Sequence, residues 1–562
     1  MEISDGLLAF LASVPIIVIL VLMVGFRWAA TRAMPVAFVT ALLLVVLVWH
    51  TPPNWILASC VEGIITAFNI LIIVFGALTL LFTLRECGAL AAINRGFTSI
   101  SPDKRIQAII IAWLFGSFIE ASAGFGTPAA LAAPLLMSLG FPALAAVMVA
   151  LIANTTCVSF GSVGTPTLIG IGNALNTTDI LKTVTEHGMN YEGFMNRIGV
   201  WTAIQHSIPG VLIPLLMIAM MTRFFGERRS FRDGLAIWPY ALFGGLCFVV
   251  PYLLVAVLLG PEFPSLIGGL AGLLILIPAT KAGFLKPKEI WDFPERKYWD
   301  NNWNGTITLE ASGNNSNVSI LRAWVPYFLI GLLLVVSRIS SLPFEGWLKF
   351  FTIDYSGILN TSVTGNIAPF YIPGIMPFMF VALITIPLFR MNRKQVSLAW
   401  KESLRRIRDP FISLMFTVPM VRLMIQSGHN PWDMTSMPIA MAEFMTRIVG
   451  KAWPLVDAFV GALGAFMAGS NTVSNMLFSL FQYSIAEHLG ISRILAVSLQ
   501  NIGGALGNMI CVQKIIAACA TVGLAGVEGL LIRRNLLPLA LVLLLTGITG
   551  LILTFLVVPG LF

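Results

Sequence analysis

Two stretches of this chain place glycines, hydroxyl groups and amides inside runs that are otherwise apolar. The first, at 116–128, reads GSFIEASAGFGTP and includes the carboxylate of Glu120, and the second, at 464–476, reads GAFMAGSNTVSNM. In hydrocarbon, broken backbone is tolerated only where protein covers it or where it lines a wet cavity. We therefore expect two broken helices or re-entrant hairpins, near 116–137 and 464–488. They should meet around a polar substrate site near the middle of a membrane, as in transporters built from internal repeats.

Glu120 is the residue best suited to exchange a proton. It lies within the apolar run IAWLFGSFIEASAGF, and an acid at such a position is costly to insert and is functional by default. We therefore expect Glu120 to couple transport to protons. The alternative is a structural carboxylate that accepts backbone N–H bonds from its own broken helix.

Two cations lie deepest in apolar sequence: Arg422, in FTVPMVRLMIQSG, and Lys514, in MICVQKIIAACA. A small organic anion in a membrane needs a fixed positive charge or helix N-termini to replace its hydration, and a guanidinium can hold a carboxylate through two parallel bonds. We predict that both cations contact the substrate. For Arg422 the alternative is that the side chain reaches the outer surface or pairs with an acid.

Small polar residues in the broken regions suit the oxygens of a 2-hydroxy acid, although they suit hydrogen bonds between helices equally well. The lone His206 is expected to be a packing residue. Besides the two cations, the predicted substrate-binding residues are Ser122, Gly124, Thr127, Asn154, Thr155, Ser470, Asn471, Asn475 and Gln513.

The elements that position these residues are transmembrane helices. Apolar residues make up 57% of the chain and charged residues 11%, and the mean hydropathy is +0.89, which together are typical of a polytopic membrane protein. We predict an all-α polytopic membrane protein with about 12–14 transmembrane helices and two repeats, each with a re-entrant hairpin or broken helix. The repeat regions are 1–281 and 322–562, and the polar segment 282–321 joins them.

The net charge of +8 follows from basic clusters between apolar runs, so the positive-inside rule explains it better than a nucleic-acid partner does. The clusters around Arg27, at 223–232, at 390–408 and around Arg533 are placed in cytoplasmic loops, together with 282–321. We expect a multi-pass protein of the plasma (inner) membrane, surrounded by lipid.

The sequence has none of the motifs that would indicate an enzyme or a pump driven by hydrolysis. It lacks a GxxxxGK[ST] loop, HExxH and CxxC, and its six cysteines have no metal-ligand spacing. We therefore expect no catalytic residues, no metal site and no cofactor.

Six motifs resemble the L-lactate permease family of bacterial and archaeal plasma membranes, and the likeness runs from about residue 7 to the C-terminus. The resemblance implies import of L-lactate, glycolate or a related small 2-hydroxy monocarboxylate by proton symport. It also implies kinship with ion transporters that have hairpin-containing inverted repeats, work by an elevator motion and are often dimers, so a homodimer is an expected assembly. The motifs are FIEASAGFGTPAALAAPLL, LIANTTCVSFGSVGTPTL, GPEFP, LRAWVPY, AGSNTVSNMLFSLFQ and IIAACATVGLAGVEG.

The chain departs from the family pattern near the second break. Asn471 stands where the pattern has an acid, Asn508 where it has a lysine, and Cys511-Val512 where it has Ser-Pro. We interpret this as the loss of an acid at 471 and a shift of the positive charge to Lys514. Proton coupling then falls on Glu120, and the alternatives are a sodium-coupled transporter or a passive facilitator of another small organic anion.

Overall fold

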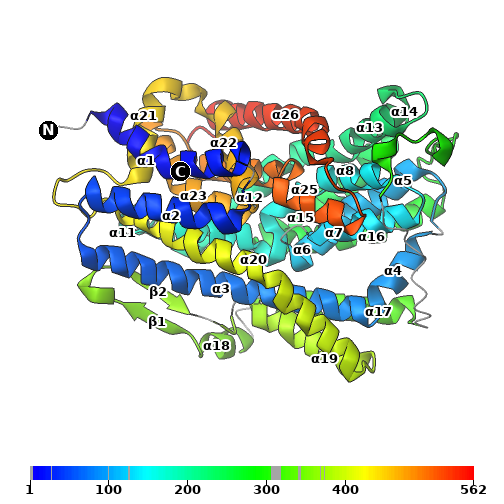
Figure 1. The fold of residues 1–562 in the computed structure, drawn as a ribbon, viewed down its shortest axis with the longest axis horizontal. Coiled ribbons are helices and arrows are strands. Elements are labelled where there is room, and N and C mark those ends of the chain that lie inside the picture. Colours follow the sequence, from blue (N-terminus) through cyan, green and yellow to red (C-terminus); the bar gives the residue numbers. More distant parts are fainter. Residues whose placement is uncertain are drawn as a thin grey trace.

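The protein is an assembly of closely packed helices, known from a computed structural model (Figure 1). The structure describes residues 4–562 apart from 27, 99, 125–126, 306–317, 339–342, 368 and 372–373. Within that part, ten helices are long and apolar enough to cross a membrane, or eleven if a bent pair counts as one span. The chain is thus an all-α polytopic membrane protein. The predicted 12–14 spans are reached only when shorter apolar helices are included, namely Pro128–Ser138, Ile320–Leu333 and Pro377–Leu388.

The helical elements fall on either side of the polar segment 282–321, and η marks the 3-10 and π-helical turns that matter below. Before it lie α1 (Asp5–Leu20), α2 (Ala30–Leu47), α3 (Pro53–Glu86), α4 (Ala89–Thr98), α5 (Lys104–Ala108), η2 (Ile109–Phe115), α6 (Gly116–Ala123), α7 (Thr127–Ser138), α8 (Ala143–Ala153), η3 (Val158–Phe160), α9 (Gly161–Thr165), η4 (Pro166–Ile171), α10 (Gly172–Leu175), α11 (Thr178–Glu186), α12 (Tyr191–Gly210), α13 (Ile213–Phe225), α14 (Phe231–Leu235), α15 (Trp238–Leu259) and α16 (Pro264–Lys281). After it lie α17 (Ile320–Arg338), α18 (Phe344–Lys349), β1 (Ile353–Ser356), β2 (Thr364–Ile367), α19 (Phe380–Leu388), α20 (Arg393–Gln426), α21 (Met437–Val449), α22 (Trp453–Ala468), α23 (Asn471–Leu489), α24 (Arg493–Leu506), η10 (Gly507–Met509), α25 (Val512–Thr521) and α26 (Glu528–Ile552).

The order of helices and turns is the same around the two glycine breaks. In the first, the helix ending with α6 stops at Gly124, α7 follows, the chain turns at Gly140, and α8 bends by 66° into Val158–Leu175. In the second, α22 stops at Gly469, α23 follows, the chain turns at Gly490, and α24 breaks before α25. All four glycines have positive φ, a conformation that side chains disfavour. Glycine therefore fixes where each helix ends.

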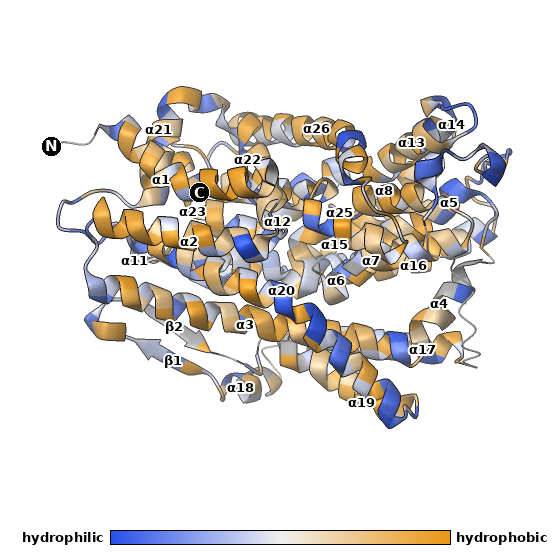
Figure 2. Ribbon diagram, viewed as in Figure 1, coloured by the Kyte–Doolittle hydropathy of each residue, from blue (hydrophilic) through white to orange (hydrophobic). Residues whose placement is uncertain are grey.

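The segment 390–408, predicted as a basic loop, is instead helical over most of its length. The side chain of Asn392 accepts a hydrogen bond from the Gln395 backbone N–H, and the Gln395 side chain accepts one from the Asn392 N–H, which forms a capping box that starts α20. At 1.5 Å per residue, the 34 residues of α20 extend roughly 51 Å. Because the hydrocarbon core is only about 30 Å thick, the charged first half of α20, coloured hydrophilic in Figure 2, extends beyond it.

A short antiparallel hairpin of β1 and β2 lies beside α3 (Figure 1). It pairs Tyr355 with Gly365. A Cβ at position 365 would lie 2.3 Å from the Tyr355 hydroxyl oxygen. Glycine at this position therefore lets the tyrosine side chain lie across the neighbouring strand.

Candidate functional site

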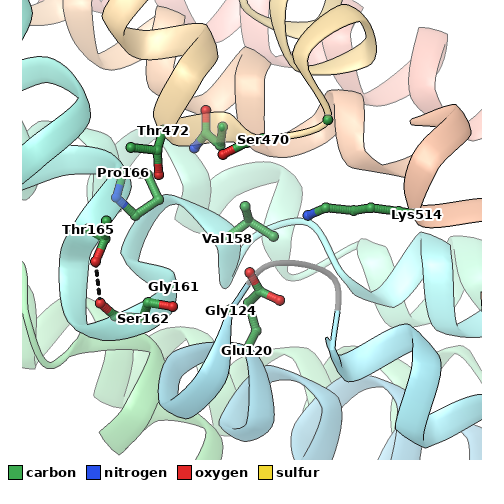
Figure 3. Close-up of a pocket in the computed structure, with 12 residues that line it drawn as sticks. Glu120, Gly124, Val158, Gly161, Ser162, Thr165, Pro166, Ser470, Thr472 and Lys514 are labelled. Carbon is green, nitrogen blue, oxygen red and sulfur yellow. Dashed lines mark hydrogen bonds between the residues drawn. The ribbon is translucent and has the colours of Figure 1, made fainter. Parts of the chain in front are cut away.

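The two glycine breaks meet at one small interior pocket, as the sequence predicts (Figure 3). Glu120 and Gly124 come from the first break, Ser470 and Asn471 from the second, and Lys514 from the start of α25. The pocket has a volume of about 20 Å³, a little more than the roughly 10–15 Å³ that one water requires. The remaining lining residues are Val158, Gly161, Ser162, Thr165, Pro166, Gly469 and Thr472.

Close packing explains why glycines surround this pocket. A Cβ on Gly161 would lie 2.8 Å from Glu120 Oε1, and a Cβ on Gly124 would lie 2.0 Å from Ser162 Oγ. The Ser162 hydroxyl donates to the Ala123 carbonyl, at 3.0 Å, and so satisfies a carbonyl at the end of α6. The broken segment after α8 therefore closes the break after α6.

Strained backbone lies in the same segment. Ser162 and Val163 have φ values of 42° and 56°, in a region that costs a non-glycine residue about 1–2 kcal/mol. Such strain persists only where surrounding structure enforces it, and it concentrates at functional sites.

The pocket brings together one cation and one acid. Glu120 is buried, with 2% of its surface exposed, and its Oε2 atom has no hydrogen-bond partner within the described part of the chain. The side chain of Lys514, also buried, extends from α25 across the pocket towards Glu120 (Figure 3). The N-terminus of α23 also lies here, because Ser470, Asn471 and Thr472 line the pocket. A helix N-terminus carries partial positive charge, so the pocket is suited to a small anion beside a group that can hold a proton.

A buried amide network links the second break to the first repeat. Asn501 Oδ1 accepts from Asn471 Nδ2 and from Asn475 Nδ2, each at 2.9 Å, and Asn501 Nδ2 donates to Thr167 Oγ1 at 2.8 Å. Asn475 Nδ2 also donates to the Pro166 carbonyl at 3.0 Å. Asn475 thus joins helices, which was the alternative reading of these polar residues.

Other predicted binding residues lie near the pocket but do not line it. The Ser122 hydroxyl donates to the Phe118 carbonyl, and the Thr155 hydroxyl to the Ile152 carbonyl. Asn154, at the end of α8, lies beside Glu120. Gln513 packs against Gly469 and lines a separate crevice. Thr127 begins α7, and its side chain lies outside the described part of the structure.

Arg422 lies in a different place from the pocket. Its Nη2 atom is 3.1 Å from Glu62 Oε1 and donates to Asn173 Oδ1 at 3.2 Å. The structure therefore does not unite the two predicted cations at one site. Arg422 pairs with an acid, as the alternative interpretation held.

Sequence reasoning passed over two buried carboxylates and one serine. Glu62, in VEGIITAF, and Asp457, in PLVDAFVG, are as enclosed as Glu120, and the same signal, an acid within an apolar run, could have found them. Ser162 lies in FGSVGTPT, where the glycines marked the break but not which hydroxyl faces the pocket. His206 is a packing residue, with Nε2 2.8 Å from Ser159 Oγ.

Comparison with known proteins covers nearly the whole chain. A family model described as L-lactate permease matches residues 8–557. A relative from Haemophilus influenzae is 32% identical, over 95% of this chain and 96% of its own length. An L-lactate permease of Bacillus subtilis is 28% identical over 90% of this chain and 89% of its own, and a glycolate permease of Escherichia coli is 27% identical over 94% and 92%.

Proposed function

Because this chain belongs to the L-lactate permease family, and is a multi-pass membrane transporter and not an enzyme, we propose that it imports L-lactate, glycolate or a related small 2-hydroxy monocarboxylate by proton symport across the plasma membrane. The observation that carries the proposal is the enclosed pocket between the two breaks, in which Lys514 and Glu120 face each other. Cytoplasmic placement of the basic clusters and of 282–321, and assembly as a homodimer, belong to the same proposal.

The anion binds at the positive end of the pocket. Lys514 and the N-terminus of α23 supply the positive charge that replaces the hydration of the substrate carboxylate. The hydroxyls of Ser162, Ser470 and Thr472 line the same space and are of the right type to bond the 2-hydroxyl group. The pocket has room for little more than one water, so it has to widen before even a short acid can enter.

Proton coupling follows from charge. With the pocket empty, Lys514 faces one carboxylate, that of Glu120; a bound carboxylate adds a second negative charge in a small buried volume. Two negative charges in one small buried pocket repel strongly, because the effective dielectric constant there is low. The complex of protein and anion is therefore favoured when a proton neutralises Glu120. Substrate and proton then cross together.

The test uses purified protein in proteoliposomes with labelled L-lactate. We expect Glu120→Gln to abolish accumulation driven by a pH gradient while exchange of lactate for lactate continues, since exchange moves no net proton. Glu186→Gln, which changes an exposed acid paired with Lys182, is the control and should behave as the wild type. Accumulation by Glu120→Gln to the wild-type extent would contradict the proton role.

The same vesicles distinguish the two alternatives. A passive facilitator equilibrates lactate and does not concentrate it when a pH gradient or a sodium gradient is applied without a membrane potential. A sodium-coupled carrier concentrates lactate when a sodium gradient replaces the pH gradient.

A further inference from the structure

A second and larger cavity, of about 510 Å³, lies between α3, α10, α20 and the β1–β2 hairpin. Its lining is polar and carries charges of both signs, with Arg422 and Lys349 as cations and Glu62 and Asp354 as acids. The central pocket shares no lining residue with this cavity.

Close approach of two helices places Glu62 opposite Arg422. A Cβ on Gly63 would lie 2.4 Å from the Cα of Pro419, so glycine is what allows α3 and α20 to cross so closely. Arg422 lies about one helical turn after Pro419. The side chains of Arg422 and Glu62 are only 4% and 6% exposed.

Within the described part of the chain, the ion pair engages only one of the two Glu62 oxygens. Glu62 Oε1 lies 3.1 Å from Arg422 Nη2, but Glu62 Oε2, although buried, has no hydrogen-bond partner within the described part of the chain. A guanidinium can hold both oxygens of one carboxylate in parallel. Arg422 can therefore hold a free carboxylate more completely than it holds Glu62.

A tyrosine of the hairpin, Tyr355, lines the same cavity as the pair. Burial and the nearby Glu62 carboxylate raise the pKa of Tyr355 to about 12. Its hydroxyl group thus stays protonated at neutral pH and can donate a hydrogen bond to an anion in the cavity.

One short helical run connects the cavity to the central pocket. η4 begins at Pro166, which lines the pocket, and continues into α10, where Asn173 lines the cavity and accepts from Arg422. Asn173 lies seven residues after Pro166, which at 1.5 Å per residue is roughly 10 Å along the helix. A small anion bound at Arg422 is thus one short step from the pocket.

We infer that this cavity is a second binding station for a small monocarboxylate, in which the substrate displaces Glu62 from Arg422 on its path to or from the central pocket. The inference rests on the proposed function. Glu62 itself indicates the ligand class, because it is a tethered carboxylate in the place that the ligand takes.

The experiment measures initial rates of labelled L-lactate uptake against lactate concentration in proteoliposomes. Arg422→Gln removes the cation. We expect KM to rise roughly tenfold or more, because the substrate then loses one charge-assisted interaction. Glu62→Gln removes the carboxylate that competes with the substrate for Arg422. We therefore expect KM to fall, by roughly several-fold. The double variant should resemble Arg422→Gln, because Glu62 acts only through Arg422.

The double variant also guards against misfolding. Breaking a buried pair leaves an unpaired charge, whereas neutralising both partners removes that penalty, so the double variant should elute as folded protein in gel filtration. Arg447→Gln removes an exposed cation paired with Asp5 and should leave KM unchanged.

A purely structural pair gives a different pattern. It predicts that Glu62→Gln raises KM or leaves it unchanged, and that the double variant has the wild-type KM. Either result, with wild-type vesicles that take up lactate, overturns the second station alone. Wild-type vesicles that take up no lactate overturn the proposed function and the station with it.

Discussion

A Cβ at position 161 would lie 2.8 Å from Glu120 Oε1 and 3.3 Å from its Cγ, so the Glu120 side chain would have to move to admit it. Gly161 has a φ of −63° and a ψ of 155°, which suit any residue, so the constraint is steric and not conformational. Overpacking of this kind costs typically about 1–3 kcal/mol. We expect Gly161→Ala to displace the Glu120 carboxylate and lower lactate uptake by roughly tenfold or more, measured as an initial rate per folded transporter.

The matched control is Gly529→Ala in α26, where an added Cβ meets nothing within 4 Å. Alanine in a helix is favoured over glycine, so this variant should transport at the wild-type rate. Wild-type uptake by Gly161→Ala would mean that Glu120 need not hold its present position.

Residue types predicted which groups could act, but not which of them share a site. Arg422 and Lys514 both sit in apolar sequence, yet one faces Glu62 and the other Glu120. The difference depends on the crossing of α3 and α20 at Gly63, a contact between residues more than 350 positions apart. No local pattern encodes such a contact, whereas the glycines of each break are local and were recognised.

At the scale of elements, the amide of Asn501 joins α23, α24 and η4. Replacing it with leucine removes one hydrogen bond each from the amides of Asn471 and Asn475 and from the hydroxyl of Thr167. Each lost hydrogen bond costs about 0.5–1.5 kcal/mol net. We therefore expect Asn501→Leu to lower the free energy of unfolding by about 2–4 kcal/mol, measured as a lower melting temperature in detergent.

Asn54→Leu is the matched control. The Asn54 side chain is half-buried and makes one long bond, of 3.5 Å, to the Leu359 carbonyl, so its loss should shift the melting temperature little. An Asn501→Leu variant that melts like the wild type would show that the two repeats are held together by apolar packing alone.

The prediction of elements succeeded where backbone chemistry is local. Positive-φ glycines end α6 and α22, and both breaks were expected from composition. The charges of 390–408 suggest exposure and so predict a loop, while the capping box at Asn392 and Gln395 starts a helix there. A charged, exposed segment can still be helical. When a helix is longer than the thickness of the membrane, its end lies in water.

At the scale of the whole molecule, composition alone identified the class, because a chain with 57% apolar residues has to place most of its helices in lipid. The outer helices α2 and α26 are apolar along most of their lengths (Figure 2). The arrangement that brings two distant breaks to one pocket depends on packing across the whole fold. The sequence predicts that the two breaks meet only because, in transporters built from internal repeats, the related breaks face each other.

Ligand binding ties the whole fold to the pocket, and this gives the last prediction. A ligand that binds only the folded protein stabilises it by RT ln(1 + [L]/Kd), about 2.7 kcal/mol at a hundredfold excess over Kd. Because the pocket is formed by α6, α9, α23 and α25 together, no single helix can bind the anion once the fold opens.

We expect L-lactate and glycolate to raise the melting temperature of the detergent-solubilised protein in a concentration-dependent way, while equal concentrations of sodium chloride do not. Lys514→Gln should remove most of this rise, since the substrate carboxylate then lacks its cation in the central pocket. A rise of the same size in Lys514→Gln would place the stabilising site elsewhere.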